Sequence, residues 1–177
     1  RQYDLDKARF YAKKAGGISV QLSAADAAFA GAVDAAVLYK EHAAAAGIEI
    51  EVIREPNDGY WKNVWMKKPW GACYWGGRPT EDWMFTTAYM GGADWNDTFW
   101  KHDRFDKLLI WARAETNQAK RREMYYAMQE IVRDEGGVVI PMFANYVLAM
   151  TDKVKHGTLA GNWDMDGQKF MERWWFA

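Results

Sequence analysis

The fold is decided by residues 18–52, which begin Ile18-Ser19-Val20-Gln21-Leu22 and end Gly47-Ile48-Glu49-Ile50-Glu51-Val52. The first run is short and rich in β-branched residues, which predicts a strand. In the last run isoleucine and valine alternate with glutamate, which is strand periodicity. The alanine-rich stretch over residues 25–46 predicts a long helix that Gly47 ends. A strand, a helix and a strand in this order are typical of a parallel α/β unit.

Similar signals continue on both sides of this stretch. Asp4 and the glycines at 16 and 17 predict a capped helix between them. After residue 52, we expect a short helix over 60–66, a buried strand over 70–75 and a helix start at residues 80–82. These elements extend the alternation of helices and strands toward the middle of the chain.

The second half of the chain is predicted to be mainly helical. Residues 91–103 lack periodicity and predict a loop, whereas apolar stripes over 105–112 and 124–132 predict two amphipathic helices. An apolar run over 138–150, broken by a proline, predicts a strand region, and 151–177 reads as irregular. The complete order predicts an α/β layer with a largely parallel sheet.

Composition restricts the class of protein. The chain has 177 residues, 50% of them hydrophobic and 27% charged, which suits one domain or one lobe of a larger protein. The formal net charge of −1 and the lack of a basic stripe argue against nucleic-acid binding. No apolar run approaches the roughly 20 residues of a membrane span. The sequence begins without a signal peptide or an initiator methionine, and we expect it to be a fragment.

Aromatic residues are unusually frequent. They make up 16% of the chain and include 11 tryptophans, more than a core of this size needs. We therefore expect some of them at a binding surface or against a missing part of the protein. The same enrichment is also compatible with sugar-stacking platforms, so a Trp-rich carbohydrate-binding module remains an alternative.

The sequence contains no recognisable catalytic constellation. The three histidines are scattered, and no nucleophile elbow, zinc-protease motif or phosphate-binding glycine loop is present. The lone Cys73 is expected to act as a small apolar side chain. His102-Asp103 could supply two metal ligands, but such pairs are common by chance. We predict no catalytic residue, no metal site and no cofactor. An enzyme lobe is therefore the least favoured of the three functions considered, after a binding protein and a carbohydrate-binding module.

Several motifs in series resemble one known family. The motifs are Tyr3-Asp4-Leu5-Asp6-Lys7-Ala8-Arg9 with Ala15-Gly16, the run 47–52, Cys73-Tyr74-Trp75-Gly76-Gly77, Asn96 with Phe105-Asp106-Lys107-Leu108-Leu109, residues 120–132, and Val139-Ile140-Pro141-Met142-Phe143. Together they resemble the peptide/nickel-type, family 5 extracytoplasmic solute-binding proteins of ABC transporters. The resemblance covers residues 3–150 with order and spacing kept.

The resemblance implies a fold, a function and partners. The fold would be α/β, one lobe of a bilobed, type II-like periplasmic-binding-protein fold with a mixed sheet flanked by helices. Residues 1–150 would form most of the C-terminal ligand-binding lobe, and 151–177 would return toward a missing N-terminal lobe. The protein would capture a peptide or similar small solute by hinge closure and deliver it to a membrane permease. It would lie in the periplasm or be lipid-anchored on the outer face of the cytoplasmic membrane.

The resemblance also implies a set of ligand-binding residues. In relatives, the strand that corresponds to Tyr74, Trp75, Gly76 and Gly77 pairs with the backbone of an extended peptide. The glycines could instead form only a loop after a strand. Trp61 lies where relatives place an aromatic residue near the cleft, although packing inside a helix core explains it equally well.

Arg78 departs from the family pattern. Peptide binders of this class usually carry an aspartate near this place, which pairs with the α-ammonium group of the ligand. An arginine favours an anionic or neutral ligand group instead. The alternative is that Arg78 points to solvent or pairs with Glu81 or Asp82.

Overall fold

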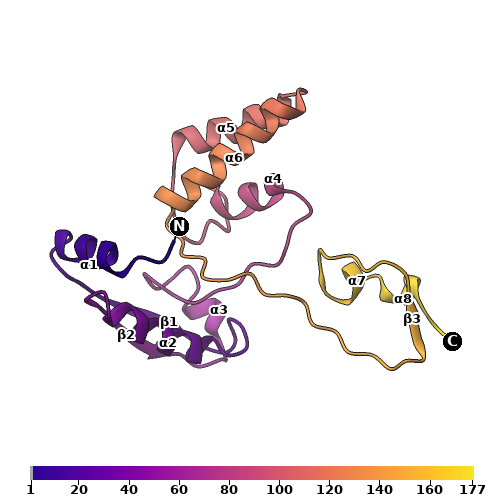
Figure 1. Cartoon of the computed structure of the whole chain (residues 1–177), viewed down its shortest axis with the longest axis horizontal. Helices are drawn as coiled ribbons and strands as arrows, with labels where there is room; N and C mark the ends of the chain where they lie inside the picture. Colours follow the sequence, from indigo (N-terminus) through magenta and orange to yellow (C-terminus); the bar gives the residue numbers. More distant parts are fainter. Residues whose placement is uncertain (1) are drawn as a thin grey trace. The chain divides into compact units, whose positions relative to one another are not determined.

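A computed structural model describes residues 2–177 of the chain. The chain divides into two compact units, one running to Trp75 and one spanning Gly76–Ala177. Figure 1 labels their helices and strands along the sequence. No helix within residues 2–177 combines the length and the apolar character needed to cross a membrane.

The first unit is built as a strand, a helix and a strand, as predicted. Its elements are α1 (Leu5–Lys14), β1 (Ile18–Ala24), α2 (Ala32–Ala44), β2 (Ile48–Arg54) and α3 (Tyr60–Asn63). β1 and β2 pair in parallel, in register from Ile18↔Ile48 to Ala24↔Arg54. Asp4 caps α1, because its carboxylate accepts the backbone N–H of Lys7 at 2.8 Å.

The predicted helix over 25–46 begins later than expected. Residues 25–31 form turns, and Gly31, with a φ of 81°, occupies the left-handed region immediately before α2. The carboxylate of Asp26 accepts the N–H of Val33 at 3.4 Å and so satisfies one of the first free amides of the helix. Alanine content favours a helix over the whole stretch, but the helix begins only after Gly31, which is its N-cap and has no capping side chain.

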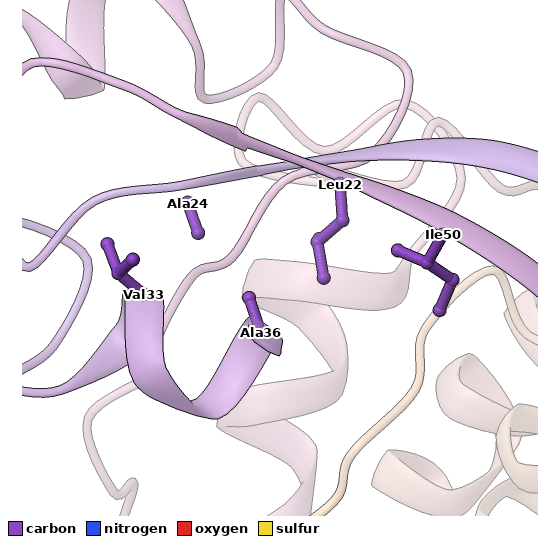
Figure 2. Packing of buried hydrophobic residues seen from close by; sticks show 5 residues of the cluster. All are labelled: Leu22, Ala24, Val33, Ala36 and Ile50. Carbon is purple, nitrogen blue, oxygen red and sulfur yellow. The ribbon is translucent and has the colours of Figure 1, made fainter. Parts of the chain in front are cut away.

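The core of the first unit lies between α2 and the β1–β2 sheet. Figure 2 shows side chains from the helix and from both strands meeting in this layer. The buried members are Leu22, Ala24, Val33, Ala36 and Ile50. Each large aliphatic side chain removed from water here stabilises the fold by about 2 kcal/mol.

The strand predicted over 70–75 is reduced to a single bridge. Gly71 pairs in parallel with Ser23, whose N–H donates to the Trp70 carbonyl and whose carbonyl accepts the Ala72 N–H. The next carbonyl, that of Ala72, accepts the hydroxyl of Tyr60 at 2.6 Å. Beyond this point the segment runs on as irregular chain.

The second unit begins with helices. α4 (Glu81–Met84) continues into a π-helix over Phe85–Tyr89, and α5 (Asp103–Ala114) is followed by α6 (Gln118–Glu135). α5 and α6 lie side by side (Figure 1). The predicted apolar stripes face inward, because the following residues are buried: Phe105, Leu109, Ala112, Met128, Ile131 and Val132. Both amphipathic helices and the loop before them are confirmed.

The end of the chain differs from the prediction in two ways. Residues 138–150 form no strand, and Phe143 and Val147 are almost fully exposed, at 92% and 89%. No strand within residues 2–177 pairs with this segment, and an apolar run without a neighbouring ladder cannot satisfy strand hydrogen bonds. Residues 151–177, predicted as irregular, contain four short elements: β3 (Val154–His156), α7 (Asp164–Gln168), α8 (Phe170–Arg173) and β4 (Trp174–Phe176).

β3 and β4 pair antiparallel, from Val154↔Phe176 to His156↔Trp174. The described chain therefore holds a parallel and an antiparallel pair in separate sheets, together with helices. The α/β class is confirmed. The division into a lobe over 1–150 and a returning segment over 151–177 stays a prediction.

Candidate functional site

The first unit gathers four aromatic side chains, Trp61, Trp65, Tyr74 and Trp75, which we call the aromatic cluster. Trp61 contacts Trp65 at 6.0 Å and Tyr74 at 5.7 Å between ring centroids, and Trp65 contacts Trp75 at 6.5 Å. All three contacts are edge-to-face, the geometry that aromatic quadrupoles favour. Trp61 and Tyr74 remain exposed, at 41% and 61%, so the cluster offers an apolar surface to solvent.

Tyr60 holds the aromatic cluster in place. Its side chain is 1% exposed, and its hydroxyl donates to the Ala72 carbonyl at 2.6 Å and lies 3.3 Å from the Ser23 carbonyl. One side chain thus ties α3, which carries Trp61, to the segment that leads into Tyr74. Burial raises the pKa of the Tyr60 phenol to about 12, with smaller contributions from Cys73 and Glu55.

Sequence reasoning named three of the four cluster members, Trp61, Tyr74 and Trp75, as ligand-binding residues, and that role stays a prediction. Sequence reasoning did not name Trp65. Its spacing of four residues from Trp61 was a usable signal, because residues four apart on a helical turn share a face. The expectation that Trp61 packs in a helix core is not what the structure shows, since its ring is substantially exposed.

A polar hollow lies at the carboxyl ends of β1 and β2. It measures about 200 Å³ and is lined by Ala25, Asp26, Val33, Asp34, Arg54, Glu55 and Asn57. Such edges are frequent ligand sites in parallel sheets. Here, however, several of the polar groups already serve the fold. Asn57 accepts the Ala27 N–H at 2.8 Å, and Glu55 accepts the Ser23 hydroxyl and the Lys68 ammonium, which lower the pKa of Glu55.

In the second unit, the loop Gly76-Gly77-Arg78 is held by side chains. Arg78 Nη1 donates to the Gly76 carbonyl at 2.9 Å and to the Gly77 carbonyl at 3.3 Å. The Arg78 guanidinium also lies 5.7 Å from the ring centroid of Trp83, within cation–π range. The guanidinium of Arg78 is therefore turned back onto its own loop.

A distant tryptophan completes this arrangement. Trp163 Nε1 donates to the Gly77 carbonyl at 2.8 Å, and the Trp163 ring contacts the Trp83 ring at 6.4 Å. A Cβ at Gly77 would lie 2.9 Å from the Asn162 carbonyl oxygen, so only glycine fits there without movement. Sequence reasoning missed Trp163, and no local pattern marks it.

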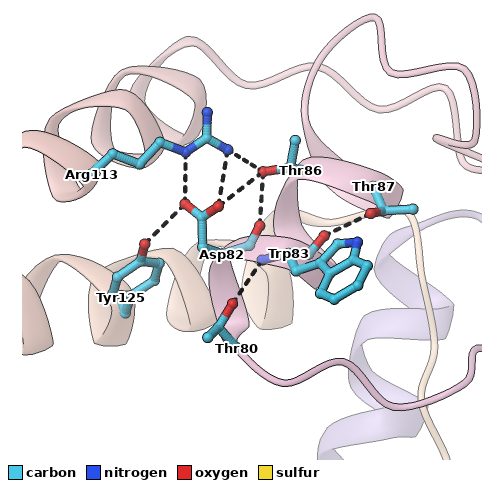
Figure 3. A network of polar contacts seen from close by, with 7 residues as sticks. All are labelled: Thr80, Asp82, Trp83, Thr86, Thr87, Arg113 and Tyr125. Atoms are coloured by element: carbon cyan, nitrogen blue, oxygen red, sulfur yellow. Dashed lines mark hydrogen bonds and ion pairs between the residues drawn. The ribbon is translucent and has the colours of Figure 1, made fainter.

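Asp82, one of the expected partners of Arg78, binds other groups. Arg113 donates to both carboxylate oxygens at 2.8 and 3.1 Å, and the Tyr125 hydroxyl donates at 3.0 Å (Figure 3). Thr86 joins through its hydroxyl, which Arg113 also contacts. Burial alone would raise the pKa of Asp82, but the hydrogen bonds from Arg113 and Tyr125 outweigh it and lower that pKa. This network ties α4 to α5 and α6 and so fixes the backbone that carries Trp83.

The histidine considered as a metal ligand has a structural role. His102 Nδ1 accepts the Phe105 N–H at 3.1 Å and caps α5, while Nε2 faces Glu135 at 3.2 Å. Among residues 2–177, no three His, Cys, Asp or Glu side chains come together in a way that could hold a metal ion.

The candidate residues of the two units differ in character. Those of the first unit form an exposed aromatic surface. Those of the second unit form a glycine loop whose carbonyls bind side chains. Of the predicted residues, the structure brings Trp61, Tyr74 and Trp75 together and places Gly76, Gly77 and Arg78 in one anchored loop.

The fold is that of one lobe of a periplasmic binding protein. No protein-family model matches the sequence, and no curated protein matches it. Solved structures do match. NikZ from Campylobacter jejuni, solved with Ni(L-His), has a TM-score of 0.65 at 16% identity over 77% of this chain and 31% of its own.

Two further solved structures of binding proteins match the fold over a similar share of this chain. DppA from Helicobacter pylori, an ABC transporter-associated periplasmic binding protein in complex with the peptide STSA, has a TM-score of 0.60 at 22% identity, covering 77% of this chain and 28% of its own. The substrate-binding protein CtaP of an ABC transporter from Listeria monocytogenes has a TM-score of 0.64 at 15% identity, covering 76% and 29%. The chain thus spans less than a third of each of these proteins, and at these identities the likeness establishes the fold.

Proposed function

We propose that this chain is part of a solute-binding component of an ABC importer, which captures a peptide or similar small solute outside the cytoplasm and delivers it to a membrane permease. The observation that carries the proposal is the fold likeness to periplasmic binding proteins over about three quarters of the chain, at 76–77%. The structures that match are binding proteins, which supports a binding function without catalysis.

Within this proposal, residues 1–150 supply most of the C-terminal lobe and 151–177 return toward an N-terminal lobe. Tyr74, Trp75 and Trp61 contact the solute through the aromatic cluster, and Gly76, Gly77 and Arg78 form the loop that follows in the sequence. The protein acts in the periplasm or as a lipid-anchored form on the outer face of the cytoplasmic membrane.

A carbohydrate ligand is the second candidate, because the exposed rings of Trp61 and Tyr74 could stack on a sugar face. A free-standing carbohydrate-binding module is disfavoured, since most such modules are β-sandwiches, whereas the first unit is a parallel strand–helix–strand arrangement. A sugar would therefore be the solute of an importer.

The first experiment is native mass spectrometry on the protein expressed from its complete gene, followed by thermal-shift measurements with di- and tripeptides and with oligosaccharides. We expect a retained small molecule or a ligand-dependent increase in melting temperature. A protein that retains nothing and responds to neither ligand class would contradict the proposal.

The variant Tyr74→Ala then tests the aromatic cluster. We expect it to weaken binding of whichever probe stabilises the protein by about tenfold, because one aromatic contact is worth about 1 kcal/mol or slightly more. Tyr126→Ala is a matched control, since both tyrosines are 61% exposed and Tyr126 lies on α6. If Tyr74→Ala and Tyr126→Ala change the binding affinity equally, the aromatic cluster is not part of the ligand site.

A further inference from the structure

The Gly77 carbonyl has both of its acceptor positions filled from within the chain. A backbone carbonyl oxygen carries two lone pairs. Trp163 Nε1 donates to this oxygen at 2.8 Å and Arg78 Nη1 donates at 3.3 Å. Arg78 Nη1 also donates to the neighbouring Gly76 carbonyl at 2.9 Å. An extended peptide that adds to this loop as a strand needs these same acceptors for its N–H groups.

Trp163 is held firmly enough to keep this position. Its ring contacts the Trp83 ring at 6.4 Å, and the Asn162 carbonyl lies against Gly77. Asp82, through Arg113 and Tyr125, anchors the short helix that carries Trp83. The indole is thus fixed on one side by an anchored helix and on the other by the glycine that it binds.

The chain after Trp163 adopts an energetically costly conformation that needs support. Met165, Asp166, Gly167 and Gln168 have φ values of 48°, 60°, 70° and 63°, all in the left-handed region. This conformation costs roughly 1–2 kcal/mol for each residue that is not glycine.

Asp166 provides the support. It is 2% exposed and accepts the Ala160 N–H at 2.6 Å and the Trp174 indole N–H at 3.1 Å, and it forms an ion pair with Arg173 at 3.0 Å. The C-terminal elements α7, α8 and β4 are therefore organised around the turn that directly follows Trp163.

We propose that Trp163 is a latch that closes the Gly77 carbonyl to ligands, so that this chain does not bind an extended peptide by strand addition at Gly76-Gly77. The inference rests on the proposed solute-binding function and narrows its ligand class. The solute is then one that does not add to this loop as an extended strand. Trp163 acts as a specificity-determining and positioning residue.

The test measures hydrogen exchange of the Trp163 indole proton by NMR on the full-length protein in D₂O, with the Trp163 peak assigned from its absence in Trp163→Phe. The reference is Trp111, which is 58% exposed on α5. We expect the Trp163 indole proton to exchange at least about tenfold more slowly than that of Trp111, because it is hydrogen-bonded inside the fold. An exchange rate equal to that of Trp111 would refute the latch.

The same measurement is repeated with trialanine at about 1 mM, a concentration that saturates sites of micromolar affinity. We expect the protection of Trp163 to be unchanged and trialanine to stabilise the protein no more than free alanine does. Tight binding of trialanine together with loss of the protection would overturn the inference. If no solute of any class binds, the proposed function fails, whereas the protection of Trp163 in the free protein still tests the latch.

Discussion

Tyr60→Phe is the most informative single substitution, because it removes one oxygen and leaves the packing almost unchanged. The ring is 1% exposed, and the hydroxyl donates to the Ala72 carbonyl at 2.6 Å. A net hydrogen bond contributes about 1 kcal/mol, and leaving a buried acceptor unpaired costs about 1–3 kcal/mol. We therefore expect the free energy of unfolding to fall by about 2 kcal/mol.

The assay is urea unfolding at pH 7, followed by the same measurement at higher pH. Burial raises the pKa of Tyr60 to about 12, above its value of about 10 in the unfolded chain. Its contribution to stability is therefore complete below pH 10 and is lost as the pH rises toward 12. The wild type should lose more stability over this interval than Tyr60→Phe does, so the two proteins should converge.

Tyr126→Phe serves as the control, since that tyrosine is 61% exposed, and it should change the free energy of unfolding by less than about 0.5 kcal/mol. We also expect Tyr60→Phe to loosen the aromatic cluster and to weaken solute binding. A variant as stable as the wild type, with an unchanged alkaline profile, would refute the role assigned to Tyr60.

Three further substitutions probe other parts of the fold by urea unfolding. Leu22→Ala should lower the free energy of unfolding by about 2–5 kcal/mol, whereas Val20→Ala on the same strand should cost much less, because Leu22 is 5% exposed and Val20 is 38% exposed; similar losses would contradict the assigned core. Asp82→Asn should cost about 1–2 kcal/mol at pH 7, a value reduced for solvent screening. Because folding lowers the pKa of Asp82, this difference should begin to shrink as the pH falls below about 4 and should vanish only once the pH has passed below the lowered pKa of the folded state; a difference that stays constant as the pH is lowered would refute the assignment. Asn117→Ala should cost about 1 kcal/mol, because Asn117 accepts the N–H groups of Ala119 and Lys120 at the start of α6, and an unchanged stability would exclude this cap.

The parts of the fold that could be predicted from sequence are those with local signals. The alternation over 48–52 identifies β2, the stripes over 105–112 and 124–132 identify α5 and α6, and Asp4 marks the start of α1. Each of these patterns lies within a single element. The order of the elements then gave the α/β class, which the structure confirms.

The prediction failed where a distant partner decides the conformation. Residues 138–150 have the composition of a strand, but they pair with no strand within the described residues. The segment 70–75 keeps only the bridge between Gly71 and Ser23, next to the Ala72 carbonyl that the distant Tyr60 hydroxyl binds. β3 and β4 are too short, at three residues each, for periodicity to reveal them. For the segment 70–75 and for the β3–β4 pair, the interactions join residues that sequence patterns do not connect, whereas residues 138–150 have no strand partner among residues 2–177.

The candidate site shows the same division. Trp61, Tyr74 and Trp75 are expected from the resemblance to the solute-binding family, and their role in binding stays a prediction. Trp65, which joins them in the aromatic cluster, could have been found from its spacing to Trp61. Trp163 could not, because it lies 86 residues from the glycine it binds. Its indole N–H and the Gly77 carbonyl meet only when the C-terminal elements are folded.

A consequence for mutational studies follows from how the two units hold their candidate residues. Tyr60 is buried and offers no surface to a ligand, yet it fixes the backbone next to Trp61 and Tyr74, which are proposed to contact the solute. Asp82 fixes only the helices of the second unit. Substitution of Tyr60 should therefore reduce stability and solute binding together, substitution of Asp82 should reduce stability, and Tyr74→Ala should reduce binding alone, because its ring is mostly exposed. Measuring both quantities for the same variants separates residues that contact the solute from residues that position them.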